Sequence, residues 1–316
     1  MKITIIAFNF GNSSKFTNGP GMSLYSFVNS IRSEYSIDLF LSMPTDISIR
    51  GVNIRSMDDS IAFRTSLASS VALHHWSGID NRFVRACKVA NNADLPVIIG
   101  PNVLDLVKRE QEENLLKVVE PSAVLTTNER LKYKLAKEHQ LDIDLFRTLI
   151  VGPDLKKWKP LNRVSDKVLW KGNSKHKVKD IDFALELKES LPQYNFKILG
   201  HPNPYDYEGH IKEAKDARVY VNTSLSETKS MTTIESWAAG IPSVTHPRVY
   251  LHGQNYKTGI IASRNIDDYR EAIIEIMEDD ALHGELRRGA RQYCVDHFSS
   301  EVTLKEYDEI VANIIA

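Results

Sequence analysis

Short apolar segments with the character of β-strands alternate along this sequence with longer segments of helical spacing, and no other feature constrains the fold as much. The first segment, residues 2–8, is almost continuously apolar, as strands buried on both faces of a parallel sheet tend to be. Such alternation predicts an α/β protein with parallel sheets covered by helices on both faces. Further strands are expected at residues 37–41, 71–74, 96–99, 123–126 and 148–151, with helices from residue 22 and at 83–90, 104–118 and 129–139.

The alternation resumes after residues 151–160, which contain one glycine and two prolines and are expected to form a linker. With 316 residues, the chain is long enough for two domains that each bury a core. In the second half, strands are expected at 167–170, 195–199, 218–222, 243–245 and 259–261, with helices at 180–191, 231–238, 267–277, 282–293 and 300–315.

The composition is that of a soluble globular protein and indicates its compartment. The net charge is −1, so no overall field draws the protein to nucleic acid or to anionic lipid. Its two cysteines, Cys87 and Cys294, are far apart and lack metal-ligand spacing, which argues against a disulfide framework or a zinc site. The first residues do not resemble a signal peptide, and no apolar run reaches the roughly 20 residues that span a bilayer. We therefore expect a cytoplasmic protein without a transmembrane segment.

Residues 224–242 are the most informative stretch for function. They follow the strand expected at 218–222, and helical spacing from Met231 places Glu227 on a loop and Glu235 about one turn inside a helix. The free amides at the start of that helix, together with the helix dipole, favour an anion such as a diphosphate between the two acids. In this interpretation Glu235 accepts ribose hydroxyls and Glu227 holds sugar hydroxyls. The alternative is that both carboxylates are solvated surface charges.

The spacing Glu-x7-Glu, followed by Ala-Ala-Gly-Ile-Pro, resembles the donor-site signature of the family-4 retaining glycosyltransferases. The resemblance implies a GT-B fold, with two Rossmann-like domains, a donor-binding cleft between them and a C-terminal crossover helix. It implies an acceptor domain at residues 1–152, a nucleotide-sugar domain at 153–298, and a helix at 299–316 that packs back on the first domain. The family usually carries glycines just after the first acid, where this chain has Thr228 and Ser230.

A second part of the resemblance concerns the donor diphosphate. In the family, the first strand of the second domain is followed by Gly-Arg and then by a lysine, and this arginine and lysine bind the diphosphate. Alignment on Gly172 places Lys179 at the lysine but Asn173 at the arginine, and Lys171, Lys175 and Lys177 remain open as replacements. The donor-binding residues that the resemblance implies are Gly21, Gly172, Lys175, Lys179, Glu227, Ser230, Met231, Thr232 and Glu235.

The first domain offers fewer motifs. Its loop at residues 9–21 contains Gly21, and a glycine here lets the family's backbone approach the donor, although a flexible loop explains it equally well. The dinucleotide fingerprint G-x-G-x-x-G is incomplete, which argues against a nicotinamide dehydrogenase. Related transferases keep a histidine near the donor sugar, so His75, in the expected loop 74–78, is the candidate catalytic residue beside Glu227, with His74 next. The alternative is a histidine held by backbone in a packed loop.

Two Asp-x-Asp triplets, at residues 142–144 and 180–182, raise the question of a metal. Asp180 begins a predicted helix, where aspartate is a good N-cap, and Asp142 is expected to lie in a polar connector before a strand. We therefore expect no obligatory metal and no cofactor, with a nucleoside-diphosphate sugar as the donor substrate.

The resulting hypothesis is a retaining glycosyltransferase that moves a hexose or pentose to the hydroxyl of an unknown acceptor bound in the cleft. Two alternatives remain: a sugar-nucleotide epimerase or phosphorylase on the same fold, and a non-catalytic nucleotide-sugar-binding module. Residues 156–179 contain nine lysines and arginines against one acid. This basic segment keeps DNA as a minority partner, with a hydroxymethylated base of the phage type as acceptor.

Overall fold

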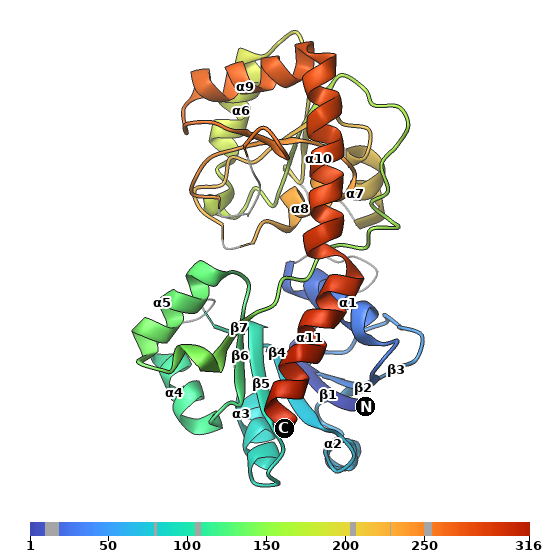
Figure 1. Cartoon of the computed structure of the whole chain (residues 1–316), viewed down its shortest axis with the longest axis vertical. Coiled ribbons are helices and arrows are strands. Elements are labelled where there is room, and N and C mark those ends of the chain that lie inside the picture. Colours follow the sequence, from blue (N-terminus) through green and yellow to red (C-terminus); the bar gives the residue numbers. More distant parts are fainter. Residues whose placement is uncertain (10–18, 79–80, 105–108, 203–206, 228, 250–254) are drawn as a thin grey trace. The chain divides into compact units, whose positions relative to one another are not determined.

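The computed structural model describes residues 1–9, 19–78, 81–104, 109–202, 207–227, 229–249 and 255–316. The chain divides into two compact units, each with its own sheet and helices (Figure 1). Unit 1 comprises Met1–Val151 and Ser300–Ala316, and unit 2 comprises Gly152–Ser299. In the described ranges, no helix combines the length and apolarity that a membrane span requires.

The sheet of unit 1 has seven strands in the order β3-β2-β1-β4-β5-β6-β7, and every neighbouring pair is parallel. After β1, strands β2 and β3 are therefore added on one side of it, and β4 to β7 are then added on the other side. The strands are β1 (Lys2–Ala7), β2 (Ser36–Leu41), β3 (Val52–Ser56), β4 (Ala72–Ser77), β5 (Val97–Asn102), β6 (Ala123–Thr126) and β7 (Phe146–Thr148).

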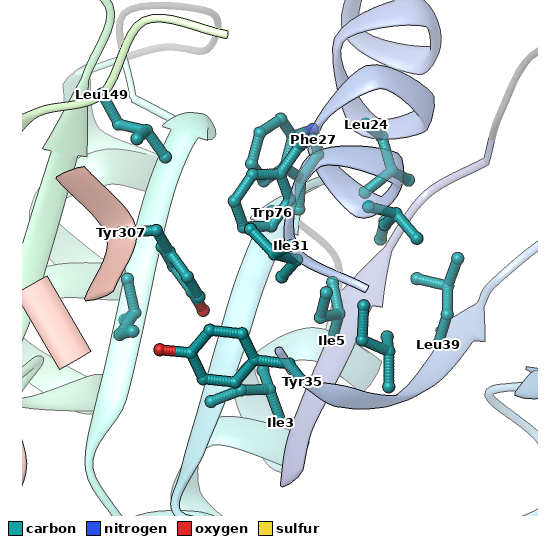
Figure 2. Close-up of a cluster of buried hydrophobic side chains, with 14 of the residues drawn as sticks. Ile3, Ile5, Leu24, Phe27, Ile31, Tyr35, Leu39, Trp76, Leu149 and Tyr307 are labelled. Atoms are coloured by element: carbon teal, nitrogen blue, oxygen red, sulfur yellow. The ribbon is translucent and has the colours of Figure 1, made fainter. Parts of the chain in front are cut away.

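Helices cover this sheet with two separate apolar clusters. In one cluster, Phe27 of α1 stacks on Trp76 of β4, with ring centroids 4.4 Å apart, and meets the edge of Tyr307 of α11 at 4.8 Å (Figure 2). Helix α11 thus belongs to the core of unit 1 although it is the last in sequence. The helices are α1 (Gly19–Ile31), α2 (Ser60–Leu67), α3 (Asn81–Asn91), α4 (Arg109–Val119), α5 (Glu129–His139), the 3-10 turn η1 (Ile143–Leu145) and α11 (Ser300–Ile315).

The sheet of unit 2 has five parallel strands in the order β12-β11-β10-β8-β9. The strands are β8 (Lys167–Lys171), β9 (Asn195–Leu199), β10 (Val219–Val221), β11 (Ser243–Thr245) and β12 (Gly259–Ile261). The helices are η2 (Lys177–Lys179), α6 (Ile181–Ser190), α7 (Tyr207–Ala214), α8 (Met231–Ala238), α9 (Ile266–Glu278) and α10 (Asp280–Phe298).

The expected α/β architecture with parallel sheets is confirmed, but the strand expected at residues 148–151 is wrong. Strand β6 is short, so its ladder with β7 ends where Thr126 meets Thr148. Leu149 and Val151 are buried as part of the first apolar cluster rather than in a strand. Five described elements were not expected from the sequence: β3, α2, α7 and the 3-10 turns η1 and η2.

Candidate functional site

In unit 2 the direction of chain building reverses beside β8. The chain passes from β8 to β9 on one side and then returns to form β10 on the other. Open parallel sheets bind ligands at the carboxyl edge of such a switch point. The loops at this edge are residues 172–180 after β8 and residues 222–230 after β10, and α8 begins where the second loop ends. The unit 2 residues predicted for the donor all lie in these two loops and in α8.

The first turn of α8 is fixed by a hydroxyl and amide network. Ser230 is the N-cap, and its side chain accepts a hydrogen bond from the Thr233 amide. Asn222, the first residue after β10, donates to the Ser230 and Thr233 hydroxyls at 3.0 Å each. The amides of Met231 and Thr232 lie in the turn where N–H groups have no acceptor within the helix. They therefore present donors, and the positive end of the helix dipole, toward the switch point.

Glu227 lies in the loop before α8 with little exposure. Its Oε1 accepts from the Lys179 ammonium and from the Ser224 hydroxyl, the latter at 2.7 Å. The Lys179 and Glu227 side chains are 21% and 11% exposed, so neither is a freely solvated charge. Lys179 thus connects the loop after β8 to the acid that precedes α8.

Glu235 lies one turn inside α8 and is 6% exposed. The interpretation of both acids as solvated surface charges is therefore wrong. Its Oε2 accepts from the ammonium of Lys171, the last residue of β8, at 2.6 Å, and the Lys171 side chain is fully buried. That ammonium also lies 4.4 Å from the ring centroid of Trp158, whose indole N–H donates to the Tyr207 hydroxyl at 3.0 Å. Both acids of the Glu-x7-Glu pattern consequently have a lysine partner from the loop or strand beside them.

Further hydrogen bonds join the two loops. The Trp170 indole donates to the Thr223 hydroxyl at 2.8 Å, and that hydroxyl donates to the Lys179 carbonyl at 2.8 Å. The Leu225 amide donates to the Val178 carbonyl at 2.8 Å. Gly172 is packed against Trp170, because a Cβ at this position would lie 3.0 Å from the indole ring. The loops are therefore held at a fixed separation at the edge of the sheet.

The residues considered as replacements for the family arginine differ in position. Asn173, Lys175 and Lys177 are exposed, whereas Lys171 is buried against Glu235. Arg264, which follows β12 and pairs with Asp180, was not predicted as a site residue. Its position at the carboxyl end of a strand was the one available signal.

Two more basic groups lie near Glu227. Burial lowers the pKa of the Lys229 side chain to about 7. His246 has Nε2 2.6 Å from the Ser224 carbonyl oxygen, and burial lowers its pKa. Thr228 lies outside the described residues.

The Asp-x-Asp triplets have the structural roles expected of them. The Asp180 side chain accepts from the Phe183 amide as the N-cap of α6, and Asp142 caps η1 just before β7. Within the described ranges, no cluster of three or more histidines, cysteines and acids is arranged to hold a metal ion.

In unit 1 the predicted residues lie in regular structure rather than in loops. Gly21 is in the first turns of α1, since the helix begins at Gly19, while residues 10–18 of the predicted loop lie outside the described residues. The loop expected at residues 74–78 is wrong, because β4 continues to Ser77, which pairs with Asn102 of β5.

Both histidines are fully buried in β4, and alternation along the strand directs them to opposite faces. Burial lowers the pKa of His74 to about 3, and its ring lies 2.7 Å from the Gly100 carbonyl and 3.1 Å from the Tyr307 hydroxyl. The His75 Nε2 lies 2.7 Å from the Gly78 carbonyl. Such contacts are those of histidines held in place by the backbone, the alternative considered above. A catalytic role for His75 stays a prediction.

Comparison with known proteins establishes the fold. No protein-family model and no curated protein matches the chain. Solved structures do match it: sucrose-phosphate synthase from Thermosynechococcus elongatus has a TM-score of 0.71 and 11% identity over 99% of both chains. HepE from Anabaena, in complex with UDP and glucose, has a TM-score of 0.71 and 10% identity over 99% of this chain and 100% of that one.

The chain has the GT-B fold.

A glycosyltransferase from Rickettsia africae is a further GT-B neighbour, with a TM-score of 0.71 and 12% identity over 99% of each chain. The GT-B fold predicted from the Glu-x7-Glu pattern is thereby confirmed. At 10–12% identity the similarity establishes architecture alone. Membership of family 4 and retention of anomeric configuration stay predictions.

Proposed function

We propose that this protein is a glycosyltransferase that binds a nucleoside-diphosphate sugar in unit 2 and transfers the sugar to an acceptor hydroxyl. The observation that carries the proposal is the arrangement at the β8/β10 switch point. There, the capped first turn of α8 lies at the carboxyl edge of the sheet together with the Lys179–Glu227 and Lys171–Glu235 pairs. Structures of the GT-B neighbour HepE contain UDP, UDP with glucose, and UDP-glucose, which makes UDP-glucose the first donor to test.

Each group has a defined role in this proposal. The Met231 and Thr232 amides and the Lys179 ammonium bind the diphosphate, since an ammonium has three N–H donors and can serve Glu227 and a phosphate oxygen together. Glu235 accepts ribose hydroxyls, and Glu227 accepts hydroxyls of the sugar. When the bond between the anomeric carbon and the diphosphate oxygen breaks, these donors stabilise the negative charge on the leaving group.

The proposed reaction retains anomeric configuration and uses no covalent enzyme intermediate. The acceptor oxygen forms the new bond to the anomeric carbon on the face that the diphosphate leaves, and the leaving phosphate takes the proton of the acceptor hydroxyl. The reaction then needs no metal and no cofactor, and a hexose or a pentose is compatible with it.

The structure weakens the case for a DNA acceptor. Four of the nine cations in residues 156–179 have an acidic partner in unit 2, so the segment is not a continuous cationic surface. The pairs are Lys157–Glu208, Lys167–Asp216, Lys171–Glu235 and Lys179–Glu227. We therefore define the acceptor only by its hydroxyl.

Calorimetric titration with UDP tests the site directly. The expected result is binding that Lys179→Ala weakens at least tenfold, because the diphosphate loses a charged donor. Lys188→Ala, on the exposed last turn of α6, is the matched control and should bind as the unmodified protein does. Equal affinity in the Lys179→Ala variant would contradict the assignment.

A second assay separates the reaction classes. The protein is incubated with UDP-glucose alone and the sugar is analysed. A glycosyltransferase leaves the sugar intact or releases it slowly by hydrolysis, whereas an epimerase converts it without an acceptor. Conversion to the epimer would overturn the proposal, and release of a sugar phosphate on addition of phosphate would assign a phosphorylase.

A further inference from the structure

A cavity of about 550 Å³ lies in unit 1 between α2 and strands β1, β2 and β3. Its described lining residues all belong to unit 1, and none of them is among those assigned to the donor. Lys2 and Ser36, the first residues of β1 and β2, line it together with Asp38, Asn53 and Arg55 of the sheet. From α2 and its N-cap, the lining residues are Asp59, Ile61, Ala62, Thr65 and Ser66.

The sheet face beneath the cavity is polar, which is unusual for a parallel sheet. Both faces of such sheets are normally covered by apolar contacts. Here Thr4 and Asp38 of the sheet and Ser66 of α2, which meets it, are respectively 0%, 7% and 1% exposed. The Thr4 and Ser66 hydroxyls lie 2.6 Å apart, and Asp38 accepts from Asn53 at 2.8 Å. These buried polar groups hold the floor of the cavity in one arrangement.

The charges that line the cavity balance. Lys2 pairs with Asp38 at 2.8 Å, and Arg55 lies 3.8 Å from Asp59. Burial by itself would raise the pKa of Asp38. Hydrogen bonds to its carboxylate, of which the one from Lys2 has the largest effect, outweigh burial and lower the pKa below its usual value. Two cations and two carboxylates favour neither an anion nor a cation, so the cavity suits an uncharged ligand.

The rim combines hydrogen-bonding groups with one apolar surface. The Arg55 and Asp59 side chains are 48% and 45% exposed, and their separation is longer than a hydrogen bond, so both can bond to a ligand. Ile61, in the first turn of α2, is 80% exposed and lines the same cavity. A ligand that fits has hydroxyls around its edge and a C–H face, which is the chemistry of a pyranose ring. The volume lies in the range of small-ligand sites, about 300–1,000 Å³.

We propose that this cavity binds a neutral saccharide of one or two rings, separately from the proposed donor site.

Saturation-transfer NMR on the full chain without nucleotide tests this inference with glucose, maltose and N-acetylglucosamine. At least one of the three should bind, with a Kd on the order of 1 mM. Thr65→Trp fills the cavity from an exposed position on α2 and should weaken that binding at least tenfold. Arg64→Trp places the same side chain on the neighbouring exposed residue outside the cavity, and should leave the binding unchanged.

Arg55→Ala provides a second variant if Thr65→Trp does not fold, because its side chain is half exposed and its loss should also weaken binding. Failure of all three sugars to bind overturns the inference. So does binding that is lost in Lys179→Ala but kept in Thr65→Trp, since the sugar then occupies the proposed donor site. Failure of UDP to bind leaves this test unaffected, so the two proposals are judged separately.

Discussion

The ammonium of Lys171 lies 2.6 Å from Oε2 of Glu235, and neither group is freely accessible to water. The second acid of the Glu-x7-Glu pattern is thus already paired within the fold. Because Lys171 ends β8 and Glu235 lies in α8, this pair also connects the strand at the switch point of unit 2 to the helix that begins beside it.

Removal of Lys171 alone should destabilise unit 2 strongly. Lys171→Met leaves the Glu235 carboxylate buried without its cation, which typically costs about 3–5 kcal/mol. Urea unfolding measures the loss. The double variant Lys171→Met, Glu235→Gln should recover much of it, because no unpaired charge remains. Additive losses in the double variant would show that the pair is not energetically coupled.

Glu227→Gln should separate sugar binding from nucleotide binding. The amide still fills the site but no longer holds the Lys179 ammonium by charge, so Lys179 is free to bind phosphate. We expect UDP affinity to be unchanged or higher, and UDP-glucose affinity to fall relative to it by at least tenfold. Isothermal titration with both ligands gives the two values, and an equal loss for both would contradict the role assigned to Glu227.

Ser230→Ala should weaken both the helix and UDP binding at the proposed nucleotide site. Loss of an N-cap hydroxyl costs about 0.5–2 kcal/mol, and here Asn222 also loses a partner. Thermal unfolding and UDP titration measure the two effects. Ser226→Ala, at an exposed position in the same loop, is the control and should change neither quantity.

Glu306 on α11 should make unit 1 less stable as the pH rises. Burial raises the pKa of its carboxyl to about 7, Glu309 adds to the rise, and a hydrogen bond from the Ile150 amide opposes it. The folded state therefore holds a proton that the unfolded chain releases near pH 4.5. Protonated Glu306 therefore contributes to the stability of the folded state below pH 4.5, and this contribution is lost progressively as the pH rises to about 7.

After allowance for solvent screening, the loss should be at most about 2 kcal/mol. Glu306→Gln should remove it, so that the difference in unfolding free energy between pH 5 and pH 8 shrinks. Glu301→Gln, at an exposed position on the same helix, should leave the pH dependence as it is. Unfolding of Glu306→Gln with the original pH dependence would exclude Glu306 as its source.

Local patterns predicted several parts of the site well. The strand at 243–245 and the helix at 231–238 have the expected bounds, and Asp180 caps α6 as its position before a helix indicated. The same local patterns placed the two histidines wrongly. From apolar spacing the strand was expected to end at His74. In the structure, Ser77 pairs with Asn102 of the next strand, β5, so that β4 continues past His74 and His75.

The sequence by itself determined the α/β layering, the parallel strands and the position of two acids around a helix start, since each depends on residues close together in the chain. Only the tertiary structure decided the partners of those acids. Lys171 meets Glu235 across 64 positions, Lys179 meets Glu227 across 48, and Arg264 reaches Asp180 across 84. Such pairs depend on which strands lie next to one another in the sheet. The spacing of residues along the chain does not encode that spatial order.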